Sequence, residues 1–261
     1  MTGLEHVLER TVLIRARRET VFRYFTDSAR FAAWWGEGSR IDPRPGGALH
    51  IRYPNGVEAS GEVVEIVPEE RVVFTFGYEG EGKPIPPGGS RVSVVLEETP
   101  QGTLLRLRHA LSTAALRDAH VPGWRYQLAL FANVVAREQH AGAGERADRF
   151  FAAWAEPDSS RRRAALTEVV TEDVVFRDAH ACTQGRDDLV DHIAASQQHM
   201  PGVRLERRGE ARQCQGTALV DWVALGGDGR ELGSGTNVFE LAPDGRIRGA
   251  VGVWSPPPRG D

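Results

Sequence analysis

The stretch GTLLRLRHALSTAALRDAHVPGWRYQLALFANVVA, residues 102–136, joins a strand pattern directly to a helix pattern. In its first part, Leu105, Leu107 and His109 alternate with arginines, as expected of a strand with one buried face. In its second part, apolar residues recur at helical spacing at Trp124, Leu128, Phe131 and Val135. We expect this helix to begin near Pro122, because proline in the first helical turn costs no hydrogen bond. The stretch therefore predicts a strand of a half-buried sheet followed by a long helix.

The residues before this stretch carry the same alternation. A strand-like run covers 7–14, and a helix is expected around 19–25. Further period-two runs, typical of strands, lie at 49–53, 72–76 and 92–96. Turn signals punctuate this region: Pro-Gly-Gly at 45–47, Pro-Asn-Gly at 54–56 and Gln-Gly at 101–102. Residues 77–89 hold five glycines and three prolines, which favours a plain surface loop, with a mobile lid over a cavity as the alternative.

A second pattern begins after the small-residue stretch 141–144, where we place a domain boundary. It opens with an amphipathic helix whose apolar residues are Ala147, Phe150, Phe151 and Trp154. Helices are then expected at 159–170 and 186–198, and strands at 174–178, 203–213, 217–225, 234–242 and 246–254. The final prolines, 256–258, are expected to fray. The chain thus divides into two α+β domains, residues 1–140 and 145–255.

Composition limits the function classes. The 261 residues carry 32 Lys+Arg and 36 Asp+Glu, a net charge of −4 that argues against nucleic-acid and membrane partners. No run is apolar enough to span a bilayer, and charges near the N-terminus argue against a secretory signal. Two cysteines allow neither a disulfide framework nor a multi-cysteine zinc site. No dinucleotide fingerprint or phosphate loop occurs. We expect a cytoplasmic protein without a cofactor.

The first domain resembles a known superfamily in the order of its short motifs. They are Val21-Phe22 through Trp34-Trp35, Arg44-Pro45-Gly46-Gly47, Gly61-Glu62-Val63, Val67-Pro68-Glu69-Glu70-Arg71, Gly102-Thr103, the strand ending at His109, and Gly123-Trp124. In this pattern residues 7–139 resemble the START-like SRPBCC superfamily, specifically bacterial proteins related to the activator of the heat-shock-protein-90 ATPase. The resemblance implies a helix-grip fold, in which a curved antiparallel sheet holds a long C-terminal helix with a cavity between them.

The second domain carries weaker motifs in a characteristic order. They are Phe150-Phe151-x-x-Trp154, Val174-Val175-Phe176-Arg177-Asp178, Gly185-Arg186, Gly235-Thr236-Asn237-Val238-Phe239 and Asp244-Gly245-Arg246-Ile247. This order resembles the SnoaL, polyketide cyclase-like and ketosteroid-isomerase-like superfamily, which includes nuclear-transport-factor-2-like proteins. The resemblance implies a cone-shaped α+β barrel with an open-mouthed pocket. Many members dimerise through the sheet, so a homodimer is an implied alternative to a monomer.

Asp178 is the candidate catalytic residue. It continues the alternation of Val174 and Phe176, and a desolvated carboxylate with a raised pKa can serve as a general base. By resemblance it also falls where ketosteroid isomerases carry their proton-abstracting aspartate. The alternative is a turn-capping aspartate at a strand end. The same resemblance places the oxyanion-hole positions on Phe150, which cannot donate a hydrogen bond, and Asn237, so steroid isomerisation itself is not expected.

Asp178, His180, Cys182, His192 and His199 raise the question of a metal site. Their spacing matches no recognised ligand pattern, so ordinary loop and helix-surface positions are favoured and no metal is predicted. The candidate ligand-binding residues are Trp34, Tyr53, His109 and Trp124 in the first domain and Phe150, Trp154, His180, Trp222 and Asn237 in the second. For His109 and Tyr53, a core position with internal hydrogen bonds is the favoured alternative.

Two functional hypotheses remain. The first is a protein that binds a small apolar or aromatic metabolite in one or both cavities, with cyclase- or isomerase-type proton transfer at Asp178. The second is a non-catalytic chaperone-associated or stress-response interaction protein, which rests on the family name of the first domain alone. The two hypotheses differ on whether the chain is an enzyme.

Overall fold

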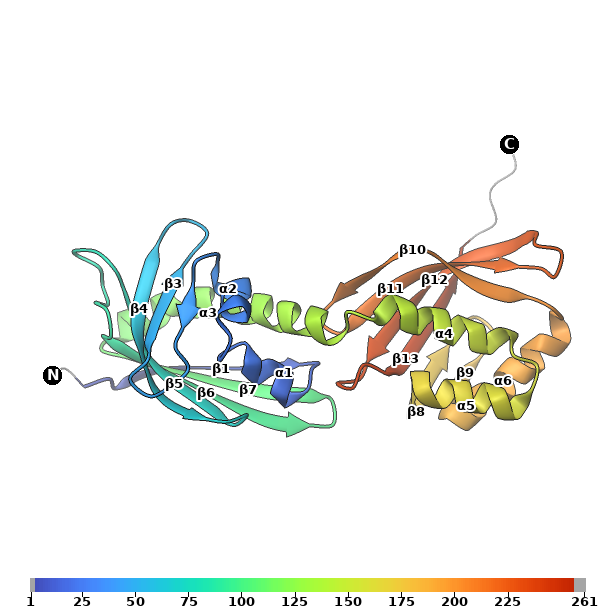
Figure 1. Cartoon of the computed structure of the whole chain (residues 1–261), viewed down its shortest axis with the longest axis horizontal. Coiled ribbons are helices and arrows are strands. Elements are labelled where there is room, and N and C mark those ends of the chain that lie inside the picture. The colour runs from blue at the N-terminus through green and yellow to red at the C-terminus, as the bar shows by residue number, and fades with distance from the viewer. Residues whose placement is uncertain (1–2, 256–261) are drawn as a thin grey trace. The chain divides into compact units, whose positions relative to one another are not determined.

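The structure, a computed structural model, describes residues 3–255, so the predicted proline tail lies outside the described part. The chain divides into two compact units, Met1–Glu138 and Gln139–Asp261. Each unit combines its own sheet with its own helices, which confirms the predicted α+β class for both (Figure 1).

The first unit is built on a seven-stranded antiparallel sheet. Its strands are β1 (His6–Ile14), β2 (Arg40–Ile41), β3 (Ala48–Arg52), β4 (Glu58–Val67), β5 (Arg71–Tyr78), β6 (Ser90–Thr99) and β7 (Gly102–Leu111). Their order across the sheet is β1-β7-β6-β5-β4-β3-β2. The period-two runs predicted from the sequence are all strands, because each places one apolar row on the buried face.

Three helices complete this unit: α1 (Arg18–Arg23), α2 (Ser28–Trp35) and α3 (Ala114–Gln139). The predicted start of the last helix was wrong, because Pro122 lies inside α3. The helix begins after Thr113, whose hydroxyl oxygen accepts from the Leu116 amide at 3.2 Å. Pro122 has no N–H, so one hydrogen bond of the ladder is missing there.

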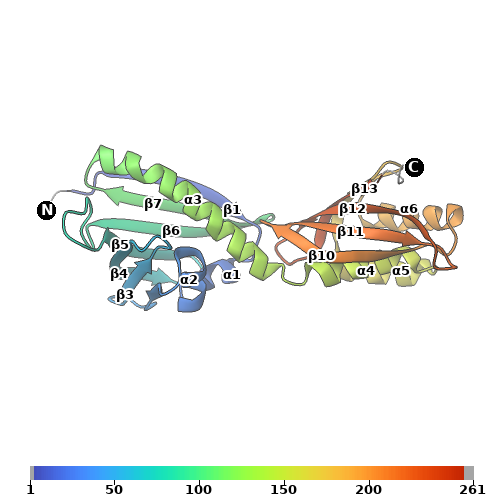
Figure 2. The ribbon, with the colours of Figure 1, turned by 90° about the horizontal axis from the view of Figure 1, so that it is seen from above.

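The apolar stripe of α3 packs on the sheet, with α2 beside it (Figure 2). The short helix α2 is absent from the sequence prediction. Asp27 caps it, accepting from the Arg30 amide at 2.9 Å, and Trp34 and Trp35 lie at its end. Trp34 packs against Phe131 of α3 with ring centroids 4.6 Å apart. The end of α2 therefore faces the middle of α3 through aromatic rings.

The glycine- and proline-rich loop between β5 and β6 packs back on its own strand. The Tyr78 amide donates to the carbonyl of Ile85, whose side chain is buried. The Pro86 carbonyl oxygen lies 1.7 Å from the position that a Cβ on Gly77 would occupy, so only glycine fits beneath the loop. This arrangement is that of an ordered surface loop.

The second unit has a six-stranded mixed sheet, in the order β10-β11-β12-β13-β8-β9. The strands are β8 (Val170–Arg177), β9 (Cys182–Gln184), β10 (Arg204–Cys214), β11 (Thr217–Leu225), β12 (Glu231–Leu241) and β13 (Ile247–Trp254). The helices are α4 (Ala143–Ala155), α5 (Ser159–Val169) and α6 (Arg186–His199). They supply one side of a core whose other side is the inner face of the sheet (Figure 1).

One arginine of this unit is buried although it stands in a run of three arginines. The run Arg161–Arg163 has the composition of a solvated helix face, yet Arg162 is 1% exposed. Its guanidinium donates to the carbonyl oxygens of Glu156 and Val190, at 2.9 and 3.2 Å, and to the Gln197 side chain at 2.7 Å. These bonds tie the α4–α5 turn to α6 and replace the hydration that a buried cation loses.

Candidate functional site

A cavity of about 570 Å³ lies in the first unit, a volume within the usual range of small-molecule sites. Its lining residues come from α2, the turn between β3 and β4, β5 and α3: Ala33, Trp34, Trp35, Gly36, Tyr53, Pro54, Asn55, Val57, Phe76, Tyr78, His120, Gly123, Trp124, Tyr126, Gln127 and Leu130. None of these is an aspartate, glutamate, lysine or arginine. The cavity is therefore suited to a neutral, mainly apolar molecule.

Aromatic rings form much of the wall. Trp35 meets Tyr53 and Trp124 edge to face, with ring centroids 5.7 Å apart in both pairs, and stacks obliquely on Trp34 at 4.3 Å. Three of the predicted ligand-binding residues, Trp34, Tyr53 and Trp124, thus lie on one wall. Such rings offer both flat faces and polarised edges to a ligand.

The structure adds a polar pair that the sequence analysis did not single out, Tyr78 and His120. The Tyr78 hydroxyl lies 3.1 Å from His120 Nε2, and His120 Nδ1 lies 2.7 Å from the Leu116 carbonyl oxygen. A signal for both existed in the sequence. Tyr78 continues the alternation of Phe74 and Phe76, and His120 precedes Trp124 by one helical turn.

His109 lies behind this wall and is not one of the lining residues. Trp124 Nε1 donates to His109 Nδ1 at 2.9 Å, and the ring's Nε2 lies 2.8 Å from the Ser90 hydroxyl, which donates to the Phe76 carbonyl at 2.7 Å. Because the indole can only donate, Nδ1 is the acceptor and Nε2 carries the proton. The favoured alternative, a core histidine with internal partners, describes this geometry.

Burial acts on the ionisation of these groups. Desolvation, assisted by the nearby His120, lowers the pKa of His109 to about 3, so its ring is neutral at physiological pH. Burial and the neighbouring Tyr78 raise the pKa of Tyr53, and burial raises the pKa of Tyr78. Both phenols therefore keep their protons, and the polar groups of the wall act by hydrogen bonding.

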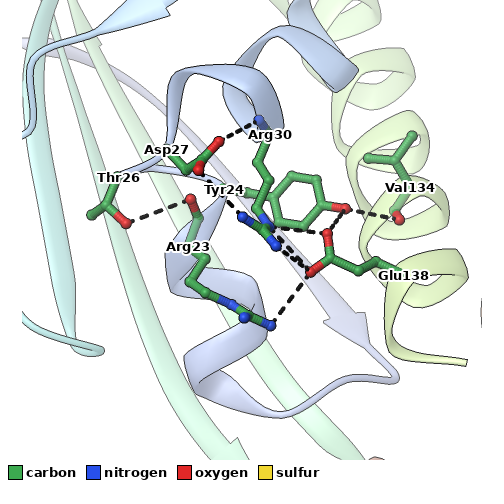
Figure 3. A network of polar contacts seen from close by, with 7 residues as sticks. All are labelled: Arg23, Tyr24, Thr26, Asp27, Arg30, Val134 and Glu138. Atoms are coloured by element: carbon green, nitrogen blue, oxygen red, sulfur yellow. Dashed lines mark hydrogen bonds and ion pairs between the residues drawn. The ribbon is translucent and has the colours of Figure 1, made fainter.

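A polar network holds α1 and α2 against the end of α3 (Figure 3). The Glu138 carboxylate accepts from Arg30 Nε at 3.0 Å and from the Tyr24 hydroxyl at 3.0 Å, and it pairs with Arg23 at 3.4 Å. Burial opposes ionisation of Glu138, but the hydrogen bonds and positive charges of these partners outweigh it and lower the pKa of Glu138. Since α2 carries the tryptophans and α3 carries the facing residues, the network fixes two sides of the cavity.

In the second unit, Asp178 lies one residue beyond the end of β8 and is half-buried. Its Oδ1 accepts from the His180 amide at 2.7 Å, and its own amide donates to the Ala181 carbonyl at 3.0 Å. This is the geometry of a capped turn. The predicted strand was therefore one residue too long at this end, because the turn takes Asp178 out of the strand.

Asn237 nevertheless lies close to Asp178. A Cβ added to Gly252 would stand 3.2 Å from Asn237 Oδ1 and 3.4 Å from Asp178 Cβ, so both residues border this glycine. Trp222 Nε1 donates to Asn237 Oδ1 at 2.9 Å. Since the indole only donates, the amide orientation is settled, and the Asn237 NH₂ group is what it offers to a ligand.

The remaining candidates of this unit separate into core and surface positions. Phe150 is fully buried, with its ring 5.3 Å from that of Phe239, and Trp154 packs against Phe176 at 5.4 Å. His180 is exposed. Among residues 3–255, nowhere do three or more histidine, cysteine, aspartate or glutamate side chains gather closely enough to hold a metal ion.

The two units match different families. Residues 15–136 match the family described as Activator of Hsp90 ATPase homolog 1-like protein (AHSA1), and residues 147–250 match the SnoaL-like domain. The chain joins an AHSA1-type domain to a SnoaL-like domain. This order confirms the resemblance inferred from the motifs. No curated protein matches the chain.

Several solved structures are similar to part of the chain. A SnoaL-like family protein from Agrobacterium tumefaciens is 28% identical, covers 46% of this chain and 99% of its own, and has a TM-score of 0.42. CalU16 from Micromonospora echinospora is 26% identical over 48% of this chain and 74% of its own, with a TM-score of 0.38. The Aha1 dimer from Colwellia psychrerythraea is 19% identical over 48% and 92%, with a TM-score of 0.39.

Neither domain contributes a membrane-spanning helix. In the part of the chain that the structure describes, every helix is too short or too polar to cross a bilayer. The cavity of the AHSA1-type domain and the Asp178 region of the SnoaL-like domain are the two candidate ligand sites.

Proposed function

We propose that the AHSA1-type domain binds a neutral, largely aromatic small molecule in its cavity. The observation that carries the proposal is a cavity of about 570 Å³ whose wall is rich in aromatic rings and has no aspartate, glutamate, lysine or arginine. Transfer of an apolar ring from water into such a wall is favourable, whereas an ion would lose its hydration without gaining a counter-charge.

Gly123 offers a way to test this. It lies on the cavity wall inside α3, and a Cβ added there meets no atom within 4 Å. Gly123→Leu therefore places a side chain at the cavity without a steric clash, and leucine is a better helix former than glycine. Ala115→Leu puts the same side chain on an exposed position about two turns before Gly123 in the same helix, outside the lining, and serves as the control.

Naphthalene is a suitable probe, since it has the aromatic surface and no polar group. Calorimetric titration of the full-length chain is expected to show binding that Gly123→Leu weakens at least about tenfold, about 1.4 kcal/mol, while Ala115→Leu leaves it unchanged. Absence of naphthalene binding to the wild-type chain would contradict the proposal and would favour the alternative of a protein-interaction role.

A second candidate function is proton transfer at Asp178 in the SnoaL-like domain. It is supported by the approach of Asp178 and Asn237 to the same glycine, Gly252, which brings a carboxylate base near an amide donor. A base abstracts a proton next to a carbonyl most readily when a donor stabilises the oxygen on which charge develops.

A further inference from the structure

The pair Tyr78–His120 gives the cavity a polar group with a defined direction. A carbonyl oxygen only accepts hydrogen bonds, so the 2.7 Å contact with Leu116 places the imidazole proton on His120 Nδ1. Nε2 of the neutral ring is then an acceptor, and the Tyr78 hydroxyl, 3.1 Å away, donates to it. The Tyr78 proton is therefore committed, and its oxygen lone pairs are left as an acceptor on the cavity wall.

Two other polar side chains around the cavity have donors engaged in buried hydrogen bonds. The Gln127 side-chain amide donates to the Trp34 carbonyl, and Trp124 donates to His109. Neither donor can turn to a ligand without giving up a buried bond, which is costly.

The indole N–H groups of Trp34 and Trp35 are buried without a partner among residues 3–255, and such donors, like the Tyr53 hydroxyl, can serve an ether oxygen as well as an alcohol oxygen. The acceptor at Tyr78 is the group that distinguishes the two molecules, because only an alcohol has a proton to donate to it.

Resting on the proposed binding function, we propose that this cavity selects neutral aromatic alcohols, whose hydroxyl group donates to the Tyr78 oxygen. The aromatic part lies against the tryptophan wall, and His120 positions Tyr78 by holding its proton. An ether of the same shape has an oxygen but no proton to give, so it leaves the Tyr78 acceptor unpaired. A carboxylate is excluded because no cationic arginine or lysine lines the cavity.

Four probes with one ring system test this: naphthalene, 2-methoxynaphthalene, 2-naphthol and 2-naphthoate, titrated calorimetrically into the full-length chain at pH 7. 2-Naphthol is expected to bind about fivefold more tightly than 2-methoxynaphthalene, the usual net effect of one neutral hydrogen bond. 2-Naphthoate is expected to bind at least about tenfold more weakly than 2-naphthol, since its charge is buried unpaired.

Tyr78→Phe keeps the ring and removes the acceptor, so it is expected to abolish the advantage of 2-naphthol while naphthalene binds as before. His120→Leu is a second variant. It frees the Tyr78 proton to donate to an ether, so the preference between 2-naphthol and 2-methoxynaphthalene should narrow. Tyr126→Phe removes a phenol that is 70% exposed on the same lining and is expected to keep the preference.

The outcomes separate the two proposals. If naphthalene binds but 2-naphthol binds no better than its methyl ether, the selection of alcohols is wrong while the binding function stands. Equal loss of the preference in Tyr126→Phe and Tyr78→Phe would also overturn it. If naphthalene itself does not bind, the binding function fails.

Discussion

At the scale of single residues, Asp178 in the SnoaL-like domain carries the sharpest catalytic hypothesis. Asp178 Oδ1 accepts a hydrogen bond from the His180 amide within its turn, and Asn237 lies nearby, bordering the same glycine, Gly252. If the carboxylate is a general base, the chain should accelerate hydrogen–deuterium exchange next to the carbonyl of 2-tetralone in D₂O. Asp178→Asn should reduce that acceleration at least about a hundredfold, the usual range for a positioned base. Proton NMR measures the rate.

The control for this experiment is Asp228→Asn, a change at an aspartate whose Oδ1 likewise accepts an amide hydrogen bond in a turn, from Arg230 at 3.0 Å. Asp228→Asn is expected to leave the hydrogen–deuterium exchange rate of 2-tetralone unchanged. Equal rates for wild type and Asp178→Asn would show that Asp178 only caps its turn.

Residue types and spacing predicted part of the first domain's cavity wall. Period-two and helical spacing place Trp124 and Tyr53 on inward faces, and the structure has both on the wall. What spacing cannot supply is the pairing of Tyr78 with His120, 42 positions apart in the chain, because only the packing of β5 against α3 brings them together. His109 is a similar case. Its place in an alternating strand pattern predicts that its side chain is buried but does not identify its hydrogen-bond partners.

At the scale of elements, the Glu138 network ties α1 and α2 to α3. Glu138→Gln is expected to lower the free energy of unfolding of the AHSA1-type domain by about 1 kcal/mol at pH 7, because the bonds from Arg30 and Tyr24 lose their charged acceptor. A carboxyl whose folded pKa lies below its ordinary value of 4.5 stabilises the fold above that value and loses the effect as pH falls through the folded pKa. The cost of the variant should therefore shrink below pH 4.5.

Urea unfolding at pH 7 and at pH 4 or below measures this difference. Glu97→Gln is the matched control, since Glu97 pairs with Arg106 at 2.8 Å between two exposed side chains. Exposed pairs contribute little, so this change should cost only a few tenths of a kcal/mol at pH 7. Equal costs for the two variants would show that the Glu138 network has no special role in holding the helices.

Helices and strands were predictable where apolar residues recur at regular spacing along one buried face. Alternation predicted five strands of the AHSA1-type domain, namely β1, β3, β5, β6 and β7, but not β2, which has two residues, or β4, whose buried positions do not alternate regularly. Helix α2 has only eight residues and too few turns to show a helical period. Pro122 misled the prediction of α3, because proline usually marks a first turn and here tertiary packing tolerates it within the helix. The three-residue strand β9 is likewise too short to show a pattern.

At the scale of the whole molecule, the order of the two domains was predictable from motif order, since each domain carries its own series of turns and apolar runs. Each also has a separate hydrophobic core, one around Phe131 and one around Phe150. The complete lining of the cavity in the AHSA1-type domain was not predictable, because it comes from α2, a turn, a strand and α3, which are far apart in the sequence.

Separate cores lead to a last prediction, that differential scanning calorimetry of the full-length chain shows two unfolding transitions. Glu138→Gln should lower one of them, and Arg162→Ala, which leaves buried carbonyls unpaired, should lower the other. Naphthalene at about ten times its dissociation constant stabilises the domain that binds it by about 1.4 kcal/mol. It should therefore raise, by about 5 °C, only the transition that Glu138→Gln identifies. A rise confined to the transition identified by Arg162→Ala would place the binding site in the SnoaL-like domain, and equal rises in both transitions would mean that both domains bind. A single transition would show that the two domains unfold together.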